Sequence, residues 1–283
     1  SSSAASDVYK RQVRINQNIA AYNSFRNLSA TNTQLGKSLE KLSSGFRINR
    51  AADDAAGLAK SESLRAEIRG SRQAIRNAQD GVSFVQTAEG ALNEVHSILQ
   101  RMRELAVDAA NTATTDGVAQ QAEVDELIAE IGAIGTNATF AGKKVFQNYS
   151  STPLTFHVGS GASQTLTITA DLALASNDVF GAPVSGVDVD GAANAAIGLI
   201  DAAITAVSTT RATLGATQNR LEHTVANLSV AVENLSASES RVRDTDMAEE
   251  MVSFTRHQIM VQAGTAMLAQ ANQVPGSVLT LLR

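Results

Sequence analysis

Cysteine and tryptophan are absent from this 283-residue chain, proline occurs three times, and aromatic residues make up 4% of it. A chain without cysteine has no disulfide, no zinc–thiolate site and no thiol nucleophile. No segment approaches the roughly 18 consecutive apolar residues of a membrane span. No continuous apolar stretch near the N-terminus has the form of a signal peptide. We therefore expect no membrane span and no cleaved secretion signal.

Signals for catalysis and for nucleic-acid binding are also missing. The formal net charge is −5, whereas nucleic-acid binding normally shows as a basic stripe. The four histidines stand apart, without an H-x-x-x-H pair or an HExxH motif. The sequence contains neither a Walker A loop nor a G-x-S-x-G nucleophile elbow. We predict a protein that is not an enzyme and that has no cofactor, no metal site and no nucleic-acid partner.

What the chain has is heptad repetition, which is strongest towards its C-terminus. One apolar stripe recurs at every seventh residue, with Val225 and Val232 on complementary positions: Leu214, Leu221, Leu228, Leu235 and Val242. After Arg243 the phase changes, and a second stripe continues to an expected stop at Pro275: Met247, Met251, Phe254, Val261 and Leu268. This spacing is typical of helices that bury a narrow stripe against another helix.

The N-terminal part carries a matching helical pattern from about residue 13 to residue 43. We assign its seam to Phe25, Leu28, Asn32, Leu35, Leu39 and Leu42. Neither end of the chain can bury its own stripe. We therefore expect the two ends to pair with each other, and any apolar stripe left over needs another subunit.

The middle of the chain combines long helices with one small sheet. We expect an irregular connector at residues 45–57, a helix over residues 58–110 and a shorter helix over residues 118–134. Gly70, Gly81 and Gly90 inside the long helix should let neighbouring helices approach closely. Residues 154–158 and 166–169 alternate apolar with polar around a Gly-Ser-Gly turn, which predicts a β-hairpin.

The predicted fold is mainly α, with long antiparallel coiled-coil helices from both chain ends and a small β-hairpin region near residues 138–190. Residues 1–12 are expected to form a disordered leader, or a scar of cloning or sequencing. Residues 13–45 and 244–283 should make a terminal coiled-coil domain. Residues 46–243 should make a helical domain that carries the hairpin.

Several long segments near both ends of the chain have a distinctive sequence. Near the N-terminus these are RINQNIAA (residues 14–21), LEKLSSGFRIN (39–49) and AADDAAGLA (51–59). Near the C-terminus they are ESRVRDTDMA (239–248), QANQ (270–273) and the leucine-rich residues 278–283. Together they resemble bacterial flagellin, the subunit of the flagellar filament, and the matches are far more specific than one short motif.

The resemblance implies a short flagellin that lacks large outer domains. Its paired terminal helices would form the inner tube of an extracellular filament used for motility, with the other helices and the hairpin around it. Export would follow the flagellar type III route, without a cleaved signal peptide. The expected partners are other copies of the chain in a helical homopolymer, an export chaperone, and the filament cap and hook-associated proteins.

Two groups of residues are candidates for function. For polymerisation we predict Leu28, Leu35, Leu42, Met251, Phe254 and Leu268 on the stripes, with Arg47 and Arg50 facing Asp244 and Asp246, within one chain or between chains. The segment from Gln100 to Val107 resembles the flagellin stretch that Toll-like receptor 5 recognises. The resemblance implies receptor contacts at Gln100, Arg101, Glu104, Leu105 and Glu123. On helix physics alone, these charges would simply be solvated and Leu105 would lie in the core.

Two alternatives remain open from the sequence. A hook–filament junction protein shares the terminal helices, although the LEKLSSG segment favours flagellin. A cytoplasmic coiled-coil adaptor would form a stable dimer with ordered ends. A filament subunit would instead keep its ends without partners until it polymerises.

Overall fold

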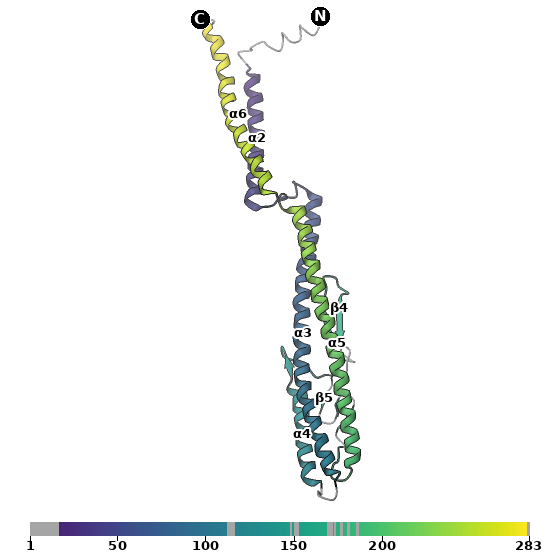
Figure 1. The fold of residues 1–283 in the computed structure, drawn as a ribbon. Helices are drawn as coiled ribbons and strands as arrows, with labels where there is room; N and C mark the ends of the chain where they lie inside the picture. The colour runs from purple at the N-terminus through teal and green to yellow at the C-terminus, as the bar shows by residue number, and fades with distance from the viewer. Residues whose placement is uncertain are drawn as a thin grey trace. The chain divides into compact units, whose positions relative to one another are not determined.

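The computed structural model describes residues 17–111, 117–147, 153–168 and 187–281 and, between these ranges, residues 149, 172, 174–175, 178–179 and 182–184. The expected leader at residues 1–12 lies outside the described residues. The chain is mainly helical and divides into two compact units, Ser1–Leu64 with Ala237–Arg283, and Arg65–Ser236. Both divisions fall inside long helices (Figure 1).

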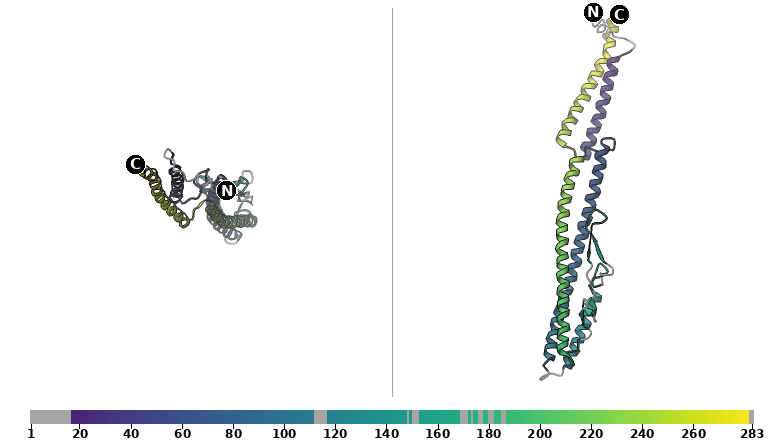
Figure 2. Two further views of the ribbon diagram at one scale, coloured as in Figure 1. Left: turned by 90° about the horizontal axis from the view of Figure 1, so that it is seen from above. Right: turned by 90° about the vertical axis from the view of Figure 1, so that its right-hand side faces the viewer.

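The first unit is built on the antiparallel pair of α2 (Ile19–Ser44) and α6 (Met247–Leu281). Figures 1 and 2 show these two helices side by side. The Asn18 side-chain amide donates to the Ala271 carbonyl at 2.7 Å near one end of the pair. Lys41 and Glu250 form an ion pair at 3.5 Å near the other end. The predicted pairing of the two chain ends is therefore confirmed.

The seam between α2 and α6 agrees only in part with the predicted stripes. Leu28, Leu35 and Leu42 on α2 and Phe254, Val261 and Leu268 on α6 are half-buried, as expected. Met247 and Met251 are exposed, so their assignment to this seam was wrong. The alternate α2 positions, however, are the half-buried Ser24 and Thr31 and the buried Ser38. Phe25, Asn32 and Leu39 are exposed, so their assignment to this seam was wrong. Small polar residues let the helices approach closely, and the bulky side chains one position further along then turn outward.

Short connectors join these helices to α3 (Ala55–Ala109) and α5 (Ala193–Arg243). Gly45 ends α2 in the left-handed region, at φ 75°, which glycine adopts without strain. Phe46 and Asp244 form an antiparallel bridge, flanked by hydrogen bonds from the Arg47 amide to the Arg243 carbonyl (2.7 Å) and from the Thr245 amide to the Gly45 carbonyl (3.0 Å). The change of heptad phase after Arg243 corresponds to this break between α5 and α6.

The end of α6 differs from expectation. The helix continues past Pro275 to Leu281, whereas the sequence suggested a stop at that proline. Proline removes one hydrogen-bond donor from a helix, but its fixed φ of about −65° is a helical value. It therefore does not have to end the helix.

The second unit packs α4 (Val118–Asn137) and short strands against the α3 and α5 segments that lie within it. The predicted hairpin is confirmed as β3 (Leu154–His157) and β4 (Thr165–Ile168), with Leu154 opposite Ile168. The remaining strands have two residues each: β1 (Thr139–Phe140), β2 (Lys143–Lys144), β5 (Leu174–Ala175), β6 (Asp178–Val179) and β7 (Ala182–Pro183). A strand of two residues is too short to show the alternation of apolar with polar residues by which a strand is predicted from sequence.

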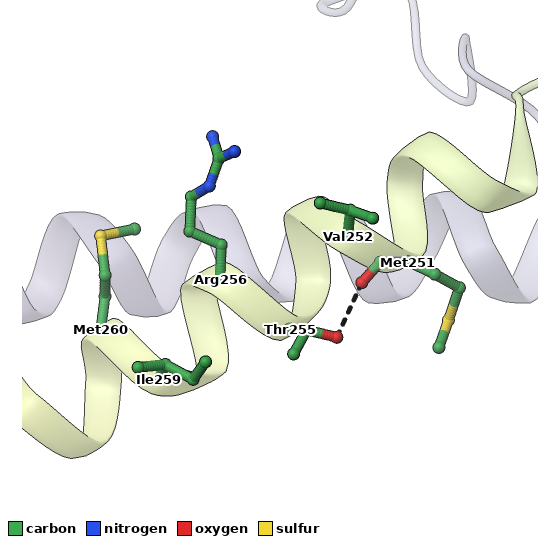
Figure 3. A pocket seen from close by; sticks show the side chains of 6 residues that line it. All are labelled: Met251, Val252, Thr255, Arg256, Ile259 and Met260. Atoms are coloured by element: carbon green, nitrogen blue, oxygen red, sulfur yellow. Dashed lines mark hydrogen bonds between the residues drawn. The ribbon is translucent and has the colours of Figure 1, made fainter.

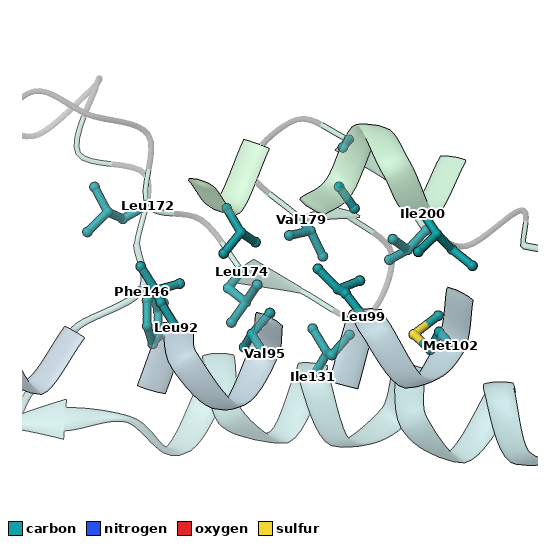
Figure 4. Packing of buried hydrophobic residues seen from close by; sticks show 14 of the residues in the cluster. Leu92, Val95, Leu99, Met102, Ile131, Phe146, Leu172, Leu174, Val179 and Ile200 are labelled. Carbon is teal, nitrogen blue, oxygen red and sulfur yellow. The ribbon is translucent and has the colours of Figure 1, made fainter. Parts of the chain in front are cut away.

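The core of this unit lies where α3, α4, α5 and the short strands meet (Figure 4). Its fully buried members include Leu92, Val95, Leu99 and Met102 of α3, Ile131 of α4 and Ile200 of α5. The predicted α5 heptad positions Leu214 and Leu221 are also buried. The burial of these side chains provides most of the stability of a helical core.

Of the three α3 glycines that were expected to allow a close approach, two lie against the hairpin. A Cβ at Gly81 would stand 3.2 Å from Leu221 and 3.3 Å from Phe156, and one at Gly70 would stand 3.1 Å from Ser160. The expected approach of a neighbouring helix is thus confirmed at Gly81, beside Leu221 of α5, whereas Gly70 lies against the turn between β3 and β4. A Cβ at Gly90 would meet nothing within 4 Å, so the expectation was wrong there.

Among the described helices, α5 alone meets the length and composition criterion for crossing a membrane. The same criterion is met by core helices, and α5 buries Ile200, Val207 and Leu214 against the rest of its unit.

Candidate assembly surface

Exposed large apolar side chains gather on the paired terminal helices. Of the thirteen such side chains among the described residues, ten lie on α2 and α6 and are 40–71% exposed. We call these ten the outer apolar set: Ile19, Tyr22, Phe25, Leu39, Met247, Met251, Val252, Ile259, Met260 and Met267. A contiguous exposed apolar surface of this kind marks an interaction site in a folded protein.

The set is a second layer of apolar residues outside the α2–α6 seam. On α6, Val252 and Ile259 are seven residues apart, and so are Met260 and Met267, so each pair keeps one heptad position. A helix that is apolar on several faces needs more partners than one neighbouring helix provides. The sequence prediction named Phe25, Leu39, Met247 and Met251 of this set but assigned them to the seam stripes. It missed the other six because it followed one stripe on each helix.

Figure 3 shows a shallow hollow on the outer side of α6, lined by Met251, Val252, Thr255, Arg256, Ile259 and Met260. The Thr255 hydroxyl donates to the Met251 carbonyl of its own helix at 2.9 Å. The one charged group in the hollow is Arg256, and no acidic side chain of the described residues pairs with it. The hollow therefore presents mainly apolar surface.

A second hollow spans α2 and α6 near residue 18. Ile19, Tyr22 and Phe25 line it from α2, and Leu268 and Asn272 line it from α6. Leu268 thus belongs both to the seam and to the wall of this hollow.

Within the chain, the predicted pairing of Arg47 and Arg50 with Asp244 and Asp246 is wrong. The Arg47 guanidinium donates to the Val242 carbonyl at 2.8 Å, and Arg50 pairs with Glu40 at 2.9 Å. Asp246 caps the start of α6 by accepting from the Ala248 amide at 2.8 Å. A free helix end prefers such a cap, and a carboxylate there also suits the helix dipole. Pairing of these charges between chains stays a prediction.

Other charged residues of the connectors contact one another within the first unit. Arg243 lies 4.8 Å above the Phe46 ring and pairs with Glu62 at 3.0 Å. The Asp53 carboxylate accepts from the Arg50 amide at 3.0 Å and the Asn49 amide at 3.3 Å. These amide donors, the Arg50 amide most of all, lower the pKa of Asp53 below its ordinary value of 3.8.

The residues proposed for receptor contact lie on α3 and α4 in the second unit. Arg101 pairs with Glu123 at 2.8 Å and with Glu104 at 3.4 Å, and all three side chains are exposed. The hydrogen bond that the Arg101 guanidinium donates to the Glu123 carboxylate raises the pKa of Arg101, so this side chain keeps its positive charge. Gln100 is exposed and contacts His96 at 3.0 Å. Leu105 is only 6% exposed, so it supports this surface from below.

The described residues contain no group of three or more histidine and acidic side chains placed to hold a metal ion. The feature that stands out is apolar area on the terminal helices.

Comparison with known proteins identifies relatives along the whole chain. Residues 15–151 match the model of the bacterial flagellin N-terminal helical region, and residues 197–282 match that of the C-terminal helical region. The flagellin of Bacillus subtilis (strain 168) is 48% identical, over 96% of this chain and 100% of its own length. Flagellin FlaB2 of Treponema pallidum (strain Nichols) is also 48% identical, over 95% of this chain and 99% of its own length.

One solved structure resembles the fold at low sequence identity. A Vibrio parahaemolyticus protein assigned to the flagellar hook-associated class superposes with a TM-score of 0.56 at 16% identity, over 68% of this chain and all of its own length. That likeness concerns the fold alone.

Proposed function

The chain belongs to the bacterial flagellin family, the non-enzymatic structural subunits of the flagellar filament, and we propose that it polymerises through the outer apolar set of its paired terminal helices. The observation that carries this proposal is the concentration of ten exposed apolar side chains on α2 and α6. The occupant of this surface is a second copy of the same chain. A filament of identical subunits buries such a surface by a repeated contact that does not close.

The expected energetics favour assembly. Fully burying a valine, leucine, isoleucine or methionine side chain stabilises by about 1.5–3 kcal/mol. Even partial burial of ten such side chains exceeds the contribution of exposed ion pairs, about 0–1 kcal/mol each. The seam residues Leu28, Leu35, Leu42, Phe254 and Leu268 support assembly by holding α2 and α6 together. Arg47 and Arg50 are proposed to contact Asp244 and Asp246 of a neighbouring copy.

The test is polymerisation of purified chain, followed by electron microscopy and sedimentation. Val252→Ser combined with Ile259→Ser should raise the critical concentration by about a hundredfold, because each change removes about 1.4 kcal/mol or more of apolar burial, which is about tenfold. Val230→Ser is the matched control, since Val230 is 57% exposed on α5 and Val252 is 61% exposed on α6. Unchanged assembly of the double variant would contradict the proposal.

Two further variants separate the parts of the mechanism. Deletion of residues 241–283 removes α6 and should abolish filaments. Arg47→Glu with Arg50→Glu should impair assembly through the charge contact between copies. Normal filaments from that double variant would refute the charge contact while leaving the apolar proposal intact.

We also propose that the free chain is a ligand of Toll-like receptor 5, through Gln100, Arg101, Glu104 and Glu123, with Leu105 beneath them. The support is the resemblance of residues 100–107 to the recognised flagellin stretch, together with the exposed bridge from Arg101 on α3 to Glu123 on α4. Planar guanidinium groups are frequent anchors of protein interfaces.

A matched pair of arginines tests this second proposal. Arg101→Ala should weaken binding to the receptor ectodomain at least about tenfold, the loss typical of an interface anchor. Arg103→Ala should not, although Arg103 is equally exposed on the same helix and pairs with Asp201 at 2.7 Å. Equal binding by both variants and the parent chain would rule out the assigned contact.

The remaining partners follow from family membership. We propose that the chain leaves the cell by the flagellar type III route with an export chaperone, and that its filament contacts cap and hook-associated proteins. A chaperone that covers the outer apolar set would keep the free chain from assembling early.

A further inference from the structure

The methionines are distributed very unevenly. The chain has five, and four of them lie on α6: Met247, Met251, Met260 and Met267. These four are 40–62% exposed, whereas Met102, the fifth, is fully buried in the core of the second unit. One chain thus carries four accessible thioethers on its candidate assembly surface and one inaccessible thioether elsewhere.

All four methionines of α6 are members of the outer apolar set. Met260 and Met267 share one heptad position, and Met251 lies on the other flank of the seam formed by Phe254, Val261 and Leu268. Figure 3 shows Met251 and Met260 at opposite ends of the hollow that Val252 and Ile259 line. A contact that buries the hollow would therefore bury both methionines.

Thioether sulfur reacts with peroxides in a simple oxygen transfer. The sulfur attacks one peroxide oxygen, the O–O bond breaks, a sulfoxide forms, and hydrogen peroxide leaves as water. The sulfur loses two electrons and the peroxide gains them. The product is polar and bulkier at the sulfur, and methionine sulfoxide reductases return it to the thioether.

We propose that the four methionines of α6 form a reversible oxidation switch on self-assembly. Peroxide converts them to sulfoxides in the free chain, which then cannot bury the outer apolar set until a reductase restores them. Assembly excludes solvent from the same sulfur atoms, so the filament resists the oxidant. This inference rests on the proposed polymerisation through α6.

Polarity explains the direction of the effect. The strongly polar S=O group loses its hydrogen bonds to water when an apolar contact covers it, and the contact supplies no donor in return. One sulfoxide at the interface should raise the critical concentration about tenfold, and several should abolish assembly in the accessible concentration range.

The experiment treats free chain with hydrogen peroxide and maps sulfoxides by peptide mass spectrometry. The α6 methionines should oxidise well before Met102, and much more slowly in preformed filaments than in the free chain. The oxidised chain should fail to sediment as filaments at concentrations where untreated chain assembles. Treatment with both methionine sulfoxide reductases should restore assembly.

Variants identify the responsible sulfur atoms. Leucine has nearly the volume of methionine and cannot be oxidised in this way, so a chain with Met247, Met251, Met260 and Met267 all replaced by leucine should assemble with and without peroxide. Met102→Leu is the matched control and should keep full sensitivity. If the fourfold variant assembles poorly even untreated, recovery of oxidised parent chain by the reductases decides the question.

The outcomes separate the two proposals. Failure of untreated chain to assemble would overturn the proposed function and this switch with it. Normal assembly of parent chain that carries sulfoxides at all four positions would overturn the switch alone. Peroxide sensitivity of an assembling fourfold leucine variant would also overturn it, because the damage would lie elsewhere.

Discussion

Replacing Gly135 by alanine should destabilise the second unit, although alanine is the better helix former. Gly135 lies inside α4, and a Cβ built there would stand 2.2 Å from the Leu174 carbonyl oxygen and 3.0 Å from the Leu174 carbonyl carbon. The obstacle is backbone, held in β5 by pairing of Leu174 with Val179. The methyl group therefore fits only if α4 and β5 move apart by more than about 1 Å from their present van der Waals contact.

The net change in the free energy of unfolding follows from two opposing effects. In a helix interior, alanine is about 1 kcal/mol more favourable than glycine. Overpacking costs typically about 1–3 kcal/mol, and an obstacle made of backbone belongs at the upper end of that range. A net loss of about 2 kcal/mol should lower the Tm of a unit of this size by about 4–8 °C.

Gly90→Ala provides the matched control within α3. A Cβ there would meet nothing within 4 Å, so only the helix gain of about 1 kcal/mol remains, and the Tm should rise by about 2–4 °C. Thermal unfolding of both variants, followed by circular dichroism at 222 nm in unassembled chain, measures the pair. A Gly135→Ala chain as stable as the parent would refute the close approach of α4 to β5.

Three further outcomes are expected. Phe84→Ala should cost the second unit about 3–5 kcal/mol in chemical denaturation, because Phe84 is buried and its ring lies 6.0 Å from Phe140 and 6.1 Å from Phe156. Asp53 has a lowered pKa, so it stabilises the connector above pH 3.8, and this stabilisation is lost as the pH falls through the lower pKa of the folded state. Hydrogen exchange at the Asn49 and Arg50 amides should accelerate at that low pH in the parent chain. In Asp53→Ala the same amides should exchange faster already at neutral pH. Arg243→Gln loses the Glu62 ion pair and the Phe46 contact, about 1 kcal/mol, and should expose residues 45–54 to proteases more than Arg241→Gln does.

Much of the helical framework could be predicted from periodicity. The sequence placed the helices within a few residues, because heptads such as Leu214, Leu221 and Leu228 carry a strong signal over many turns. The pairing of the two chain ends followed from stripes that neither end could bury alone. The hairpin of β3 and β4 followed from alternation over four residues on each side of a glycine turn.

The predictions that were wrong have identifiable physical causes. The seam of α2 uses Ser24, Thr31 and Ser38, which an apolar pattern does not reveal, so the bulkier Phe25 and Leu39 were placed there instead. Arg47 and Arg50 were matched to acidic residues by charge sign, whereas backbone carbonyls and Glu40 lie closer in the fold. The six members of the outer apolar set on α6 could have been found by scoring every heptad position of residues 247–268 rather than one stripe.

The pairing of α2 with α6 also bears on the order in which the chain folds. The hydrogen bond from Asn18 to Ala271 joins residues 253 positions apart, and a contact of such separation forms slowly because a long loop must close first. The helices and hairpin of the second unit are joined by short connections and can form earlier. A chain emerging from the ribosome holds α2 without a partner until nearly the whole sequence has been made. That interval gives any holding factor time to act before the ends meet.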